Sequence, residues 1–461
     1  MPIALIPGSI PLTDGVNRML SSNDFVFVSD WFYPSWTKKR QFKLINKVVL
    51  YKEMKSLKFQ QEQELKQQNY HALLVFVFND YNLWHILERK ESFESLYDSD
   101  ILVERLVVFA QSFLMQNEID RVVIFETPHA PFEYVFCRVA EFLEIEVNII
   151  KQSAVPWRSL ITKGIQGNDP IKLPFEERRG NEKKLLKDYL LTKTTSYESA
   201  IPTYEKERYV KFNGKIWSWK VELNKVLINR DKNIAISFLE SRSKYKSYKR
   251  YVEQESPYDF NKRNVVFFLH YQPERTTLPE GGIYNQQFLA IQQLRQIVPN
   301  DITIYVKEHP STYRNFFKYN TRTKKFYETI SALANVKLVS METNTFELID
   351  HSLFVATITG TVAIEAVCRG RVAVYFGNSM YQNLPGTIHF NELLGSALLV
   401  EEVIHKKHKF EFSKVEEYFY QLLSYTEGEL SSNKDYYAAV DYRSSAAKCL
   451  EKLLLNHHSR N

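Results

Sequence analysis

The sequence predicts an α/β protein with two doubly wound domains, each built on a parallel sheet, and a helical connector between them. Two separate series of short β-branched and aromatic runs alternate with segments of helical spacing. The 461 residues exceed the usual size of one core and suit two domains. We expect an N-terminal α/β domain at 1–165, a helical connector at 166–260, a C-terminal α/β domain at 261–412, and C-terminal helices at 413–461 that could cross back to the first domain.

The first series of strand-like runs defines the N-terminal domain. Its runs are rich in Val, Ile and Phe, and helical segments separate them, as in a parallel sheet covered by helices. The expected strands are 25–28, 72–79, 121–125 and 147–150, and the expected helices include 102–117 and 132–143.

The second series has the same pattern and defines the C-terminal domain. Five apolar runs bounded by polar residues alternate with amphipathic segments. The expected strands are 264–270, 302–307, 336–339, 353–358 and 371–376, and the expected helices are 286–296, 323–333 and 361–368.

The connector differs in composition from both domains. It is charged and amphipathic, which favours helices. Its basic stretch RSKYKSYKR, residues 242–250, is open to two interpretations. A solvated helix face is the one we favour, and a site for a polyanion or lipid phosphate is the alternative.

Charge and cysteine content narrow the class of partner and the compartment. A net charge of +6 without an arginine-rich tail indicates anionic substrates or an anionic membrane surface, and we expect no nucleic-acid partner. Three widely spaced cysteines suggest neither a disulfide framework nor a zinc site. The first residues lack a basic region followed by an apolar stretch, and no apolar window reaches the length of a membrane span, so we expect neither a signal peptide nor a spanning helix. We expect a cytoplasmic protein that is neither exported nor integral, and leave open a peripheral contact with the inner membrane.

The first of three polar clusters follows the first strand of the C-terminal domain. In VVFFLHYQPERTTLPEGG the strand leads into His270, Gln272 and Glu274, and then into Glu280 and the pair Gly281 and Gly282. A carboxylate beside two glycines at a strand end can approach a substrate closely. An ordinary strand-to-helix loop is the alternative.

The second cluster, Lys307 to Pro310, follows the next strand. Proline restricts the turn and so limits the directions of His309. A lysine and a histidine at a strand end can donate hydrogen bonds to a phosphate and neutralise a leaving group. A single His-Pro pair is common, so this cluster gains weight only from its neighbours.

The third cluster, Thr359, Gly360 and Thr361, lies between a strand and a helix that carries Glu365. Small residues at a helix start favour an anion, and Glu365 could reach ribose hydroxyls. A plain helix cap by either threonine is the alternative. Parallel strands end at one edge of their sheet, so we expect all three clusters to meet there.

The three clusters together resemble a known family. The order H-x-Q-P-E at 270–274, K-E-H-P at 307–310 and T-G-T-x-x-x-E-A at 359–366 is similar to bacterial capsule and O-antigen glycosyltransferases that use CMP-activated ulosonic acids, especially β-Kdo transferases. The resemblance implies the GT-B arrangement of two domains facing across a cleft. It also implies a CMP-sugar donor and a glycan or lipid-linked glycan acceptor of the capsule, lipopolysaccharide or O-antigen kind.

The resemblance assigns roles to individual residues. His309 and Pro310 would contact CMP, and the turn at Thr359 would hold its phosphate. The residues that we expect at the CMP-sugar are Gln272, Gly281, Gly282, Lys307, His309, Pro310, Thr359, Gly360, Thr361 and Glu365. In the N-terminal half, VVIFETPHAPFEYVF is similar to a segment of related capsule proteins and would place Glu126, His129 and Glu133 on the acceptor side. Glu133 could instead be a first-turn helix residue.

The chemistry of the donor defines the catalytic residues. A departing CMP requires stabilisation of a phosphate and of an oxocarbenium-like sugar. Likeness to retaining transferases implies a covalent adduct on an acidic residue, for which we choose Glu274, although the family more often has aspartate there. In an inverting enzyme, Glu126 or His129 would be the general base. The only D-x-D, Asp98 to Asp100, is typical of a helix cap, so we expect no metal and no cofactor besides the donor.

Two other functions remain open from the sequence. A CDP-glycerol or UDP-sugar enzyme would use a similar fold with another donor. A non-catalytic scaffold of glycan assembly would keep the fold without the chemistry.

Overall fold

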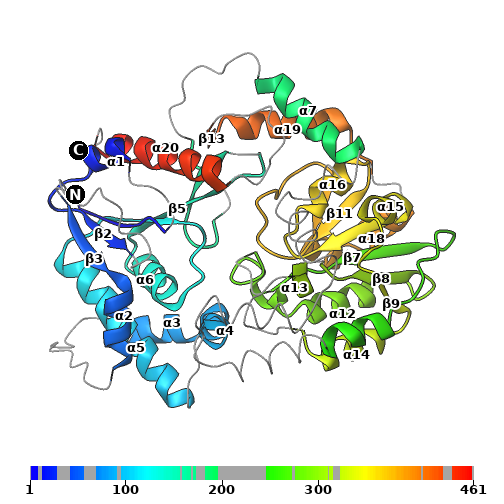
Figure 1. The fold of residues 1–461 in the computed structure, drawn as a ribbon, viewed down its shortest axis with the longest axis horizontal. Helices are drawn as coiled ribbons and strands as arrows, with labels where there is room; N and C mark the ends of the chain where they lie inside the picture. Colours follow the sequence, from blue (N-terminus) through cyan, green and yellow to red (C-terminus); the bar gives the residue numbers. More distant parts are fainter. Residues whose placement is uncertain are drawn as a thin grey trace, which may run out of the picture. The chain divides into compact units, whose positions relative to one another are not determined.

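The computed structural model describes residues 2–8, 13–28, 42–56, 69–90, 95–155, 158–167, 170–172, 182–195, 246–272, 276–309, 311–314, 322–405, 409–428 and 439–458. The chain forms two compact units. The first contains Met1–Glu182 with Phe419–Lys434 and Ala438–Asn461, and the second contains Lys183–Tyr418 with Asp435–Tyr437. Figure 1 shows a sheet with helices in each unit.

The first unit is built on a sheet in the order β13-β6-β5-β4-β1-β2-β3. The five strands β1 to β5 run parallel, β6 pairs antiparallel with β5, and β13 pairs antiparallel with β6. From β1 the chain adds β2 and β3 on one side, and then returns to add β4 and β5 on the other side. The pair β1 and β4 is therefore the switch point of the sheet. The strands are β1 (Ile3–Ile6), β2 (Phe25–Val28), β3 (Lys43–Asn46), β4 (Arg121–Phe125), β5 (Glu146–Gln152), β6 (Ser159–Lys163) and β13 (Thr426–Glu427).

Helices cover the first sheet. Phe113, Phe132 and Phe136 form edge and tilted ring contacts with Phe27 of β2. The C-terminal helix α20 packs Leu450, Leu453 and Leu454 into a core shared with β1 and β4. The helices of this unit are α1 (Asp14–Met19), α2 (Lys47–Lys55), α3 (Tyr70–Phe78), α4 (Tyr81–Lys90), α5 (Leu96–Gln116), α6 (Pro131–Phe142) and α20 (Ala439–His458).

The second unit has a fully parallel sheet in the order β12-β11-β10-β7-β8-β9. Numbered within the unit, this is the 3-2-1-4-5-6 order of dinucleotide-binding folds, with its switch point between β7 and β10. The strands are β7 (Asn264–Phe268), β8 (Thr303–Lys307), β9 (Val336–Val339), β10 (Phe354–Thr357), β11 (Val372–Tyr375) and β12 (Thr387–His389). Every residue of β7, β8, β10 and β11 is buried, as strands covered on both faces require.

The helices of the second unit lie on both faces of its sheet, α12 with α14 and α15 with α16 (Figure 1). The helices are α7 (Glu182–Thr195), η3 (Gly282–Asn285), α12 (Gln287–Ile297), α13 (Ser311–Arg314), α14 (Lys324–Ser331), α15 (Thr345–His351), α16 (Val362–Cys368), α17 (Phe390–Leu394) and α18 (Ala397–Ile404). Helix α19 (Phe412–Leu423) carries the chain from the second unit into the first.

The predicted α/β class with two doubly wound, mainly parallel sheets is confirmed. All five strands expected in the second series are present. One element is wrong: residues 72–79 form helix α3 and not a strand. Short apolar runs do not distinguish a strand from a buried helix, and here Leu73 and Val77 are buried at helical spacing while Val75 is 44% exposed.

Most of the predicted connector, residues 173–181 and 196–245, lies outside the described residues. The described part at 246–253 is helical and belongs to the second unit. Ser247 and Tyr251 face its core, whereas Lys246 and Lys249 are exposed. The described end of the basic stretch is therefore an amphipathic helix with a solvated basic face.

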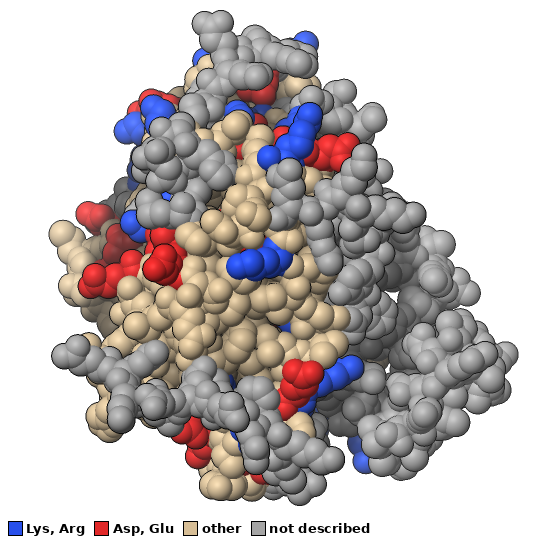
Figure 2. Space-filling model, turned by 90° about the vertical axis from the view of Figure 1, so that its left-hand side faces the viewer, with Lys and Arg blue, Asp and Glu red and all other residues tan. Residues whose placement is uncertain are grey.

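Two surface properties bear on partners. Within the described parts of the chain, no helix has the length and apolarity that crossing a bilayer requires. On the face that Figure 2 presents, a largely uncharged area is bordered by both basic and acidic residues, and several acidic residues lie together at its left.

Helix α20 provides a direct test of the first core. Leu454 is 1% exposed and its neighbour Leu455 is 54% exposed. We expect Leu454→Ala to lower the free energy of unfolding of the first unit by about 2–5 kcal/mol, because it leaves a cavity. Leu455→Ala is the matched control and should change it by less than about 0.5 kcal/mol. Hydrogen exchange of β1 and β4 measures both, and equal effects would contradict this packing.

Candidate functional site

The candidate site lies at the carboxyl edge of the second sheet, beside its switch point. Strand β7 ends before His270, β8 ends at Lys307, and β10 ends before Thr359. In open α/β sheets ligands bind at this edge. The structure therefore brings the three polar clusters to one edge, and hydrogen bonds connect them.

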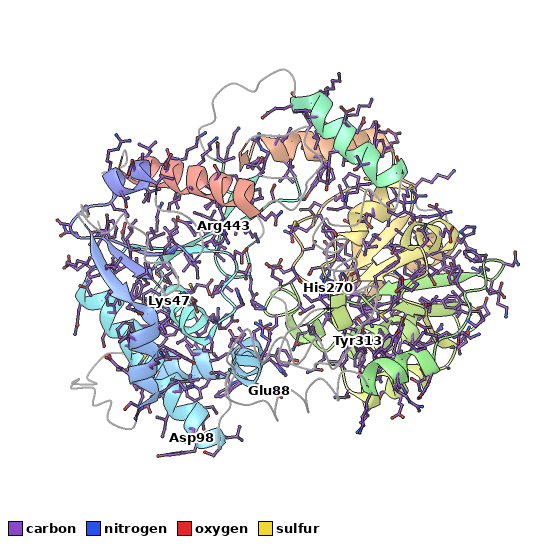
Figure 3. The ribbon with its side chains drawn as sticks, viewed as in Figure 1. Lys47, Glu88, Asp98, His270, Tyr313 and Arg443 are labelled. Atoms are coloured by element: carbon purple, nitrogen blue, oxygen red, sulfur yellow. The ribbon has the colours of Figure 1, made fainter. Side chains whose placement is uncertain are left out.

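His270 links the ends of β7 and β10. Its Nε2 accepts a hydrogen bond from the backbone N–H of Thr359 at 3.1 Å and lies 3.2 Å from the hydroxyl of Thr357. Because Nε2 accepts this bond, the ring nitrogen that carries a proton is Nδ1. The side chain of Gln287 holds the main chain of His270 through two hydrogen bonds of 2.8 and 3.0 Å. His270, labelled in Figure 3, is 7% exposed and holds the segments after β7 and β10 together.

The turn Thr359–Gly360–Thr361 packs tightly against His270. The hydroxyl of Thr359 donates to the carbonyl of Thr276 at 2.7 Å, so both its hydroxyl and its N–H are engaged within the protein. A Cβ on Gly360 would lie 2.8 Å from the Thr357 hydroxyl, which explains the glycine. Thr361 is exposed and makes no side-chain cap of α16. Thr361 is thus the hydroxyl of this turn best placed to meet a phosphate.

Of the predicted glycine pair, Gly281 packs close to the same turn, whereas a Cβ on Gly282 would have no atom within 4 Å. A Cβ on Gly281 would come within 2.4 Å of the carbonyl of Thr277, and one on Gly377 within 2.6 Å of Thr359 Cγ2. The N–H of Asn378 donates to the carbonyl of Glu280 at 2.6 Å. The loop before η3 and the loop after β11 therefore meet at the turn after β10.

A buried ion pair lies beneath the His-Pro segment. Arg322 Nε donates to Glu308 Oε2 at 2.7 Å, and their side chains are 2% and 0% exposed. The carboxylate also accepts hydrogen bonds from the hydroxyl of Tyr327 at 2.6 Å and the N–H of His309 at 2.8 Å. Burial works against the charge of Arg322, but Glu308 outweighs it and raises the pKa of the guanidinium. Tyr251 accepts a hydrogen bond from the N–H of Glu308 at 3.2 Å.

Gln272 and His309 lie on either side of this pair. Gln272 accepts a hydrogen bond from Arg322 at 3.0 Å and donates to the carbonyl of Asn285 at 2.8 Å. The ring of His309 lies 5.1 Å from the ring of Tyr271. Gln272 is thus held by the side chain of Arg322 and the backbone of Asn285, and His309 has an aromatic neighbour in the loop after β7.

Lys307 and Glu365 form a second group at the edge. Lys307 is 3% exposed and donates to the hydroxyl of Thr345 at 3.2 Å. Burial raises the pKa of Glu365, against the opposing charges of Lys193, Lys307 and Arg369. Lys193 Nζ lies 3.8 Å from the Glu365 carboxylate. This group is buried and cationic, as a site for an anion requires.

In the first unit, three predicted residues lie after β4, at the edge of the sheet next to its switch point. Glu126 has φ of 63°, an uncommon backbone conformation for this residue type. His129 Nδ1 lies 3.0 Å from the carbonyl of Thr127, so Nδ1 carries a proton and donates it to this carbonyl. Glu133 pairs with Lys47 (labelled in Figure 3). Burial favours the neutral acid, but Lys47 outweighs it and lowers the pKa of Glu133.

Some predicted residues are not placed, and some site residues were missed. Glu274 and Pro310 lie outside the described residues. Arg322 was not predicted, because it lies fourteen positions after Glu308 in a basic stretch typical of a surface. Lys193 was missed for the same reason.

Asp98 forms a capping box with Ser95 at the start of α5, as expected of a cap. Among the described residues, no group of three or more His, Cys, Asp or Glu could hold a metal ion.

Fold and site together define an α/β protein with a polar site at the switch point of a Rossmann-type sheet. Residues 234–389, which contain this sheet, match the family described as "Capsule polysaccharide biosynthesis protein". The resemblance to capsule biosynthesis proteins is therefore confirmed for these residues. Among curated proteins, none matches the sequence.

Solved structures show only distant likeness. The KpsC β-Kdo 2,7 transferase of Thermosulfurimonas dismutans is 12% identical, with 81% of this chain and 96% of that chain covered and a TM-score of 0.32. The β-Kdo 2,4 transferase of the same KpsC is 11% identical, with 59% and 73% covered and a TM-score of 0.27. The UDP-GlcNAc 2-epimerase of Methanocaldococcus jannaschii is 12% identical, with 92% and 100% covered and a TM-score of 0.25. Likeness at this level says nothing about the activity of this chain.

The Lys47–Glu133 pair predicts a pH-dependent stability of the first unit. The lowered pKa of Glu133 means that the contribution is present above the ordinary value of 4.5 and is lost as the pH falls through the folded-state value. We expect Lys47→Met to lower the free energy of unfolding by about 1–3 kcal/mol at pH 7, because it leaves a largely buried carboxylate unpaired.

The matched control is Lys52→Met, which removes the same charge from an exposed position of α2. Its effect should stay within about 0.5 kcal/mol. Hydrogen exchange of β3 and α6 at pH 7 and about pH 4 measures both variants. The loss in Lys47→Met should shrink at the lower pH, and a loss that grows there would contradict the pairing.

Proposed function

We propose that this protein is a glycosyltransferase that moves an ulosonic acid, of the Kdo, sialic, pseudaminic or legionaminic kind, from its CMP donor to a bacterial surface glycan. One observation carries the proposal. Three motifs that are distant in the sequence meet at the switch point of a Rossmann-type sheet, where the hydrogen bond from Thr359 to His270 joins two of them. The match of residues 234–389 to capsule biosynthesis proteins supports the same class of reaction.

The donor residues divide between the nucleotide and the sugar. We assign the phosphate of CMP to His309, Lys307 and Thr361, because two cationic or donor side chains and an exposed hydroxyl lie at one sheet edge. We assign the ribose to Glu365, and the loop of Gly281 to close approach of the donor. Departing CMP takes the bonding electron pair onto its phosphate, and hydrogen bonds from these groups stabilise that charge.

Two routes to the acceptor follow from the chemistry. In the retaining route Glu274 attacks the anomeric carbon as CMP leaves, and the acceptor hydroxyl then displaces the carboxylate. In the inverting route a base in the first unit takes the proton of the acceptor hydroxyl. We assign this role to His129, because the hydrogen bond from its Nδ1 to the carbonyl of Thr127 orients the ring. A donor with one phosphate needs no chelated divalent ion, so we propose a metal-independent reaction in the cytoplasm, at or near the inner membrane.

The identity of the nucleotide is the first test. We expect CMP to raise the melting temperature of the second unit, because a ligand at 100 times its Kd stabilises by about 2.7 kcal/mol. UDP, GDP and CDP-glycerol should give no comparable shift at equal concentration. A shift with UDP or CDP-glycerol in place of CMP would transfer the protein to another donor class, and EDTA should leave the CMP shift unchanged.

Donor turnover is the second test. With a panel of CMP-ulosonic acids and a glycan acceptor, we expect His309→Ala to slow CMP release by roughly 10²–10³-fold, because it removes a phosphate donor. Glu274→Gln should stop transfer in the retaining route. The control is His405→Ala, at an exposed histidine of the same unit whose ion pair with Glu401 is worth little. Release that is unaffected by His309→Ala and Glu274→Gln, or absent from the unsubstituted protein, would refute the proposal.

A further inference from the structure

Arg322 joins two of the three site motifs through one guanidinium group. Its Nε and one terminal nitrogen face the Glu308 carboxylate at 2.7 and 3.5 Å. The same terminal nitrogen donates to the carbonyl of His270 at 2.6 Å, and the other donates to Gln272 Oε1 at 3.0 Å. The segment after β7 and the segment after β8 therefore share a single side chain.

Glu308 transmits this position to His309. Besides Arg322, its carboxylate accepts hydrogen bonds from the N–H of His309 at 2.8 Å and the hydroxyl of Thr312 at 3.0 Å, residues of the turn that carries the His-Pro pair. The hydroxyl of Tyr327 donates to the other oxygen at 2.6 Å. Movement of the carboxylate would therefore move the backbone of His309.

The planar shape of the guanidinium matters as much as its charge. Its carbon lies 4.5 Å from the centre of the Phe326 ring, which packs against the group. Three acceptors in three directions match the rigid fork of arginine. A lysine ammonium could keep the pair with Glu308 but would leave Gln272 or the His270 carbonyl without its donor.

We propose that Arg322 is a positioning residue of the donor site, which holds Gln272 and His309 at the separation that the nucleotide requires. This inference rests on the proposed function for its ligand, but not for its geometry. Arg322 itself is 2% exposed and acts through Gln272 and Glu308, not by touching the donor.

A second buried arginine provides the matched control. Arg295 is 8% exposed in the same unit and donates to the carbonyls of Ile302, Val298 and Pro299, away from the motifs. Arg322→Lys and Arg295→Lys therefore make the same chemical change at two buried carbonyl-binding sites. Only the first touches the site.

The experiment compares these two variants with the unsubstituted protein. We expect similar losses of melting temperature in both, but a CMP affinity weakened roughly ten-fold and a lower kcat only in Arg322→Lys, because small displacements of positioning groups are costly. Hydrogen exchange should accelerate at 269–272 and 308–313 in Arg322→Lys alone. Equal loss of CMP affinity in both variants would overturn the inference.

A charge-neutral double variant covers the case in which Arg322→Lys fails to fold. Arg322→Met with Glu308→Gln removes the buried pair without leaving an unpaired charge. It should fold and yet lose CMP affinity by a similar factor, and CMP binding at full strength would overturn the inference. If the unsubstituted protein binds no CMP, the proposed function fails. The exchange measurement still decides on Arg322, because unchanged exchange at both segments would overturn its positioning role.

Discussion

The geometry at the carboxyl edge of the second sheet depends on the buried ion pair between Arg322 and Glu308. Removing two charges from water costs several kcal/mol for each, and the pair is tolerated only where the remaining donors and acceptors are satisfied. Here the carboxylate accepts from an arginine, a tyrosine, a threonine and a backbone N–H, and the guanidinium serves two further acceptors. Such a network fits one arrangement of the strand ends, since any other would leave a buried charge without partners.

The parallel sheets were predictable because each strand is a short apolar run, and such runs recur along the chain between helical segments. A strand covered on both faces is mainly apolar, and Asn264–Phe268 and Thr303–Lys307 meet that condition except at Asn264, Thr303 and Lys307, at their ends. Parallel strands also carry their following residues to one edge, so the meeting of His270, Lys307 and Thr359 followed from the order of elements alone. The order of the strands, and not the motifs themselves, therefore determines where these residues lie along the sheet.

The failures have a different physical origin. Helix α3 is as apolar as a strand, and only the helices α5 and α6 packed against it determine its periodicity. The short strands β12 and β13 contain only three and two residues, too few to form a recognisable run, and each is defined by its pairing with a neighbouring strand. Arg322 shows the same limit for the site, because a sequence of Thr, Arg and Lys indicates a surface until a buried carboxylate is placed beside it.

Burial separates the roles of chemically similar residues at the edge. His270 and Thr359 form hydrogen bonds with each other, and Thr359 also bonds to the loop at Thr276, so both residues belong to the scaffold of the site. Thr361 is exposed, and His309 is held by its backbone while its ring stands beside that of Tyr271. A site whose scaffold is already hydrogen-bonded needs little reorganisation when charge develops on a leaving phosphate. The buried network therefore determines the positions of the few polar groups at the surface. Those groups can meet a ligand accurately only if the buried residues hold them in place.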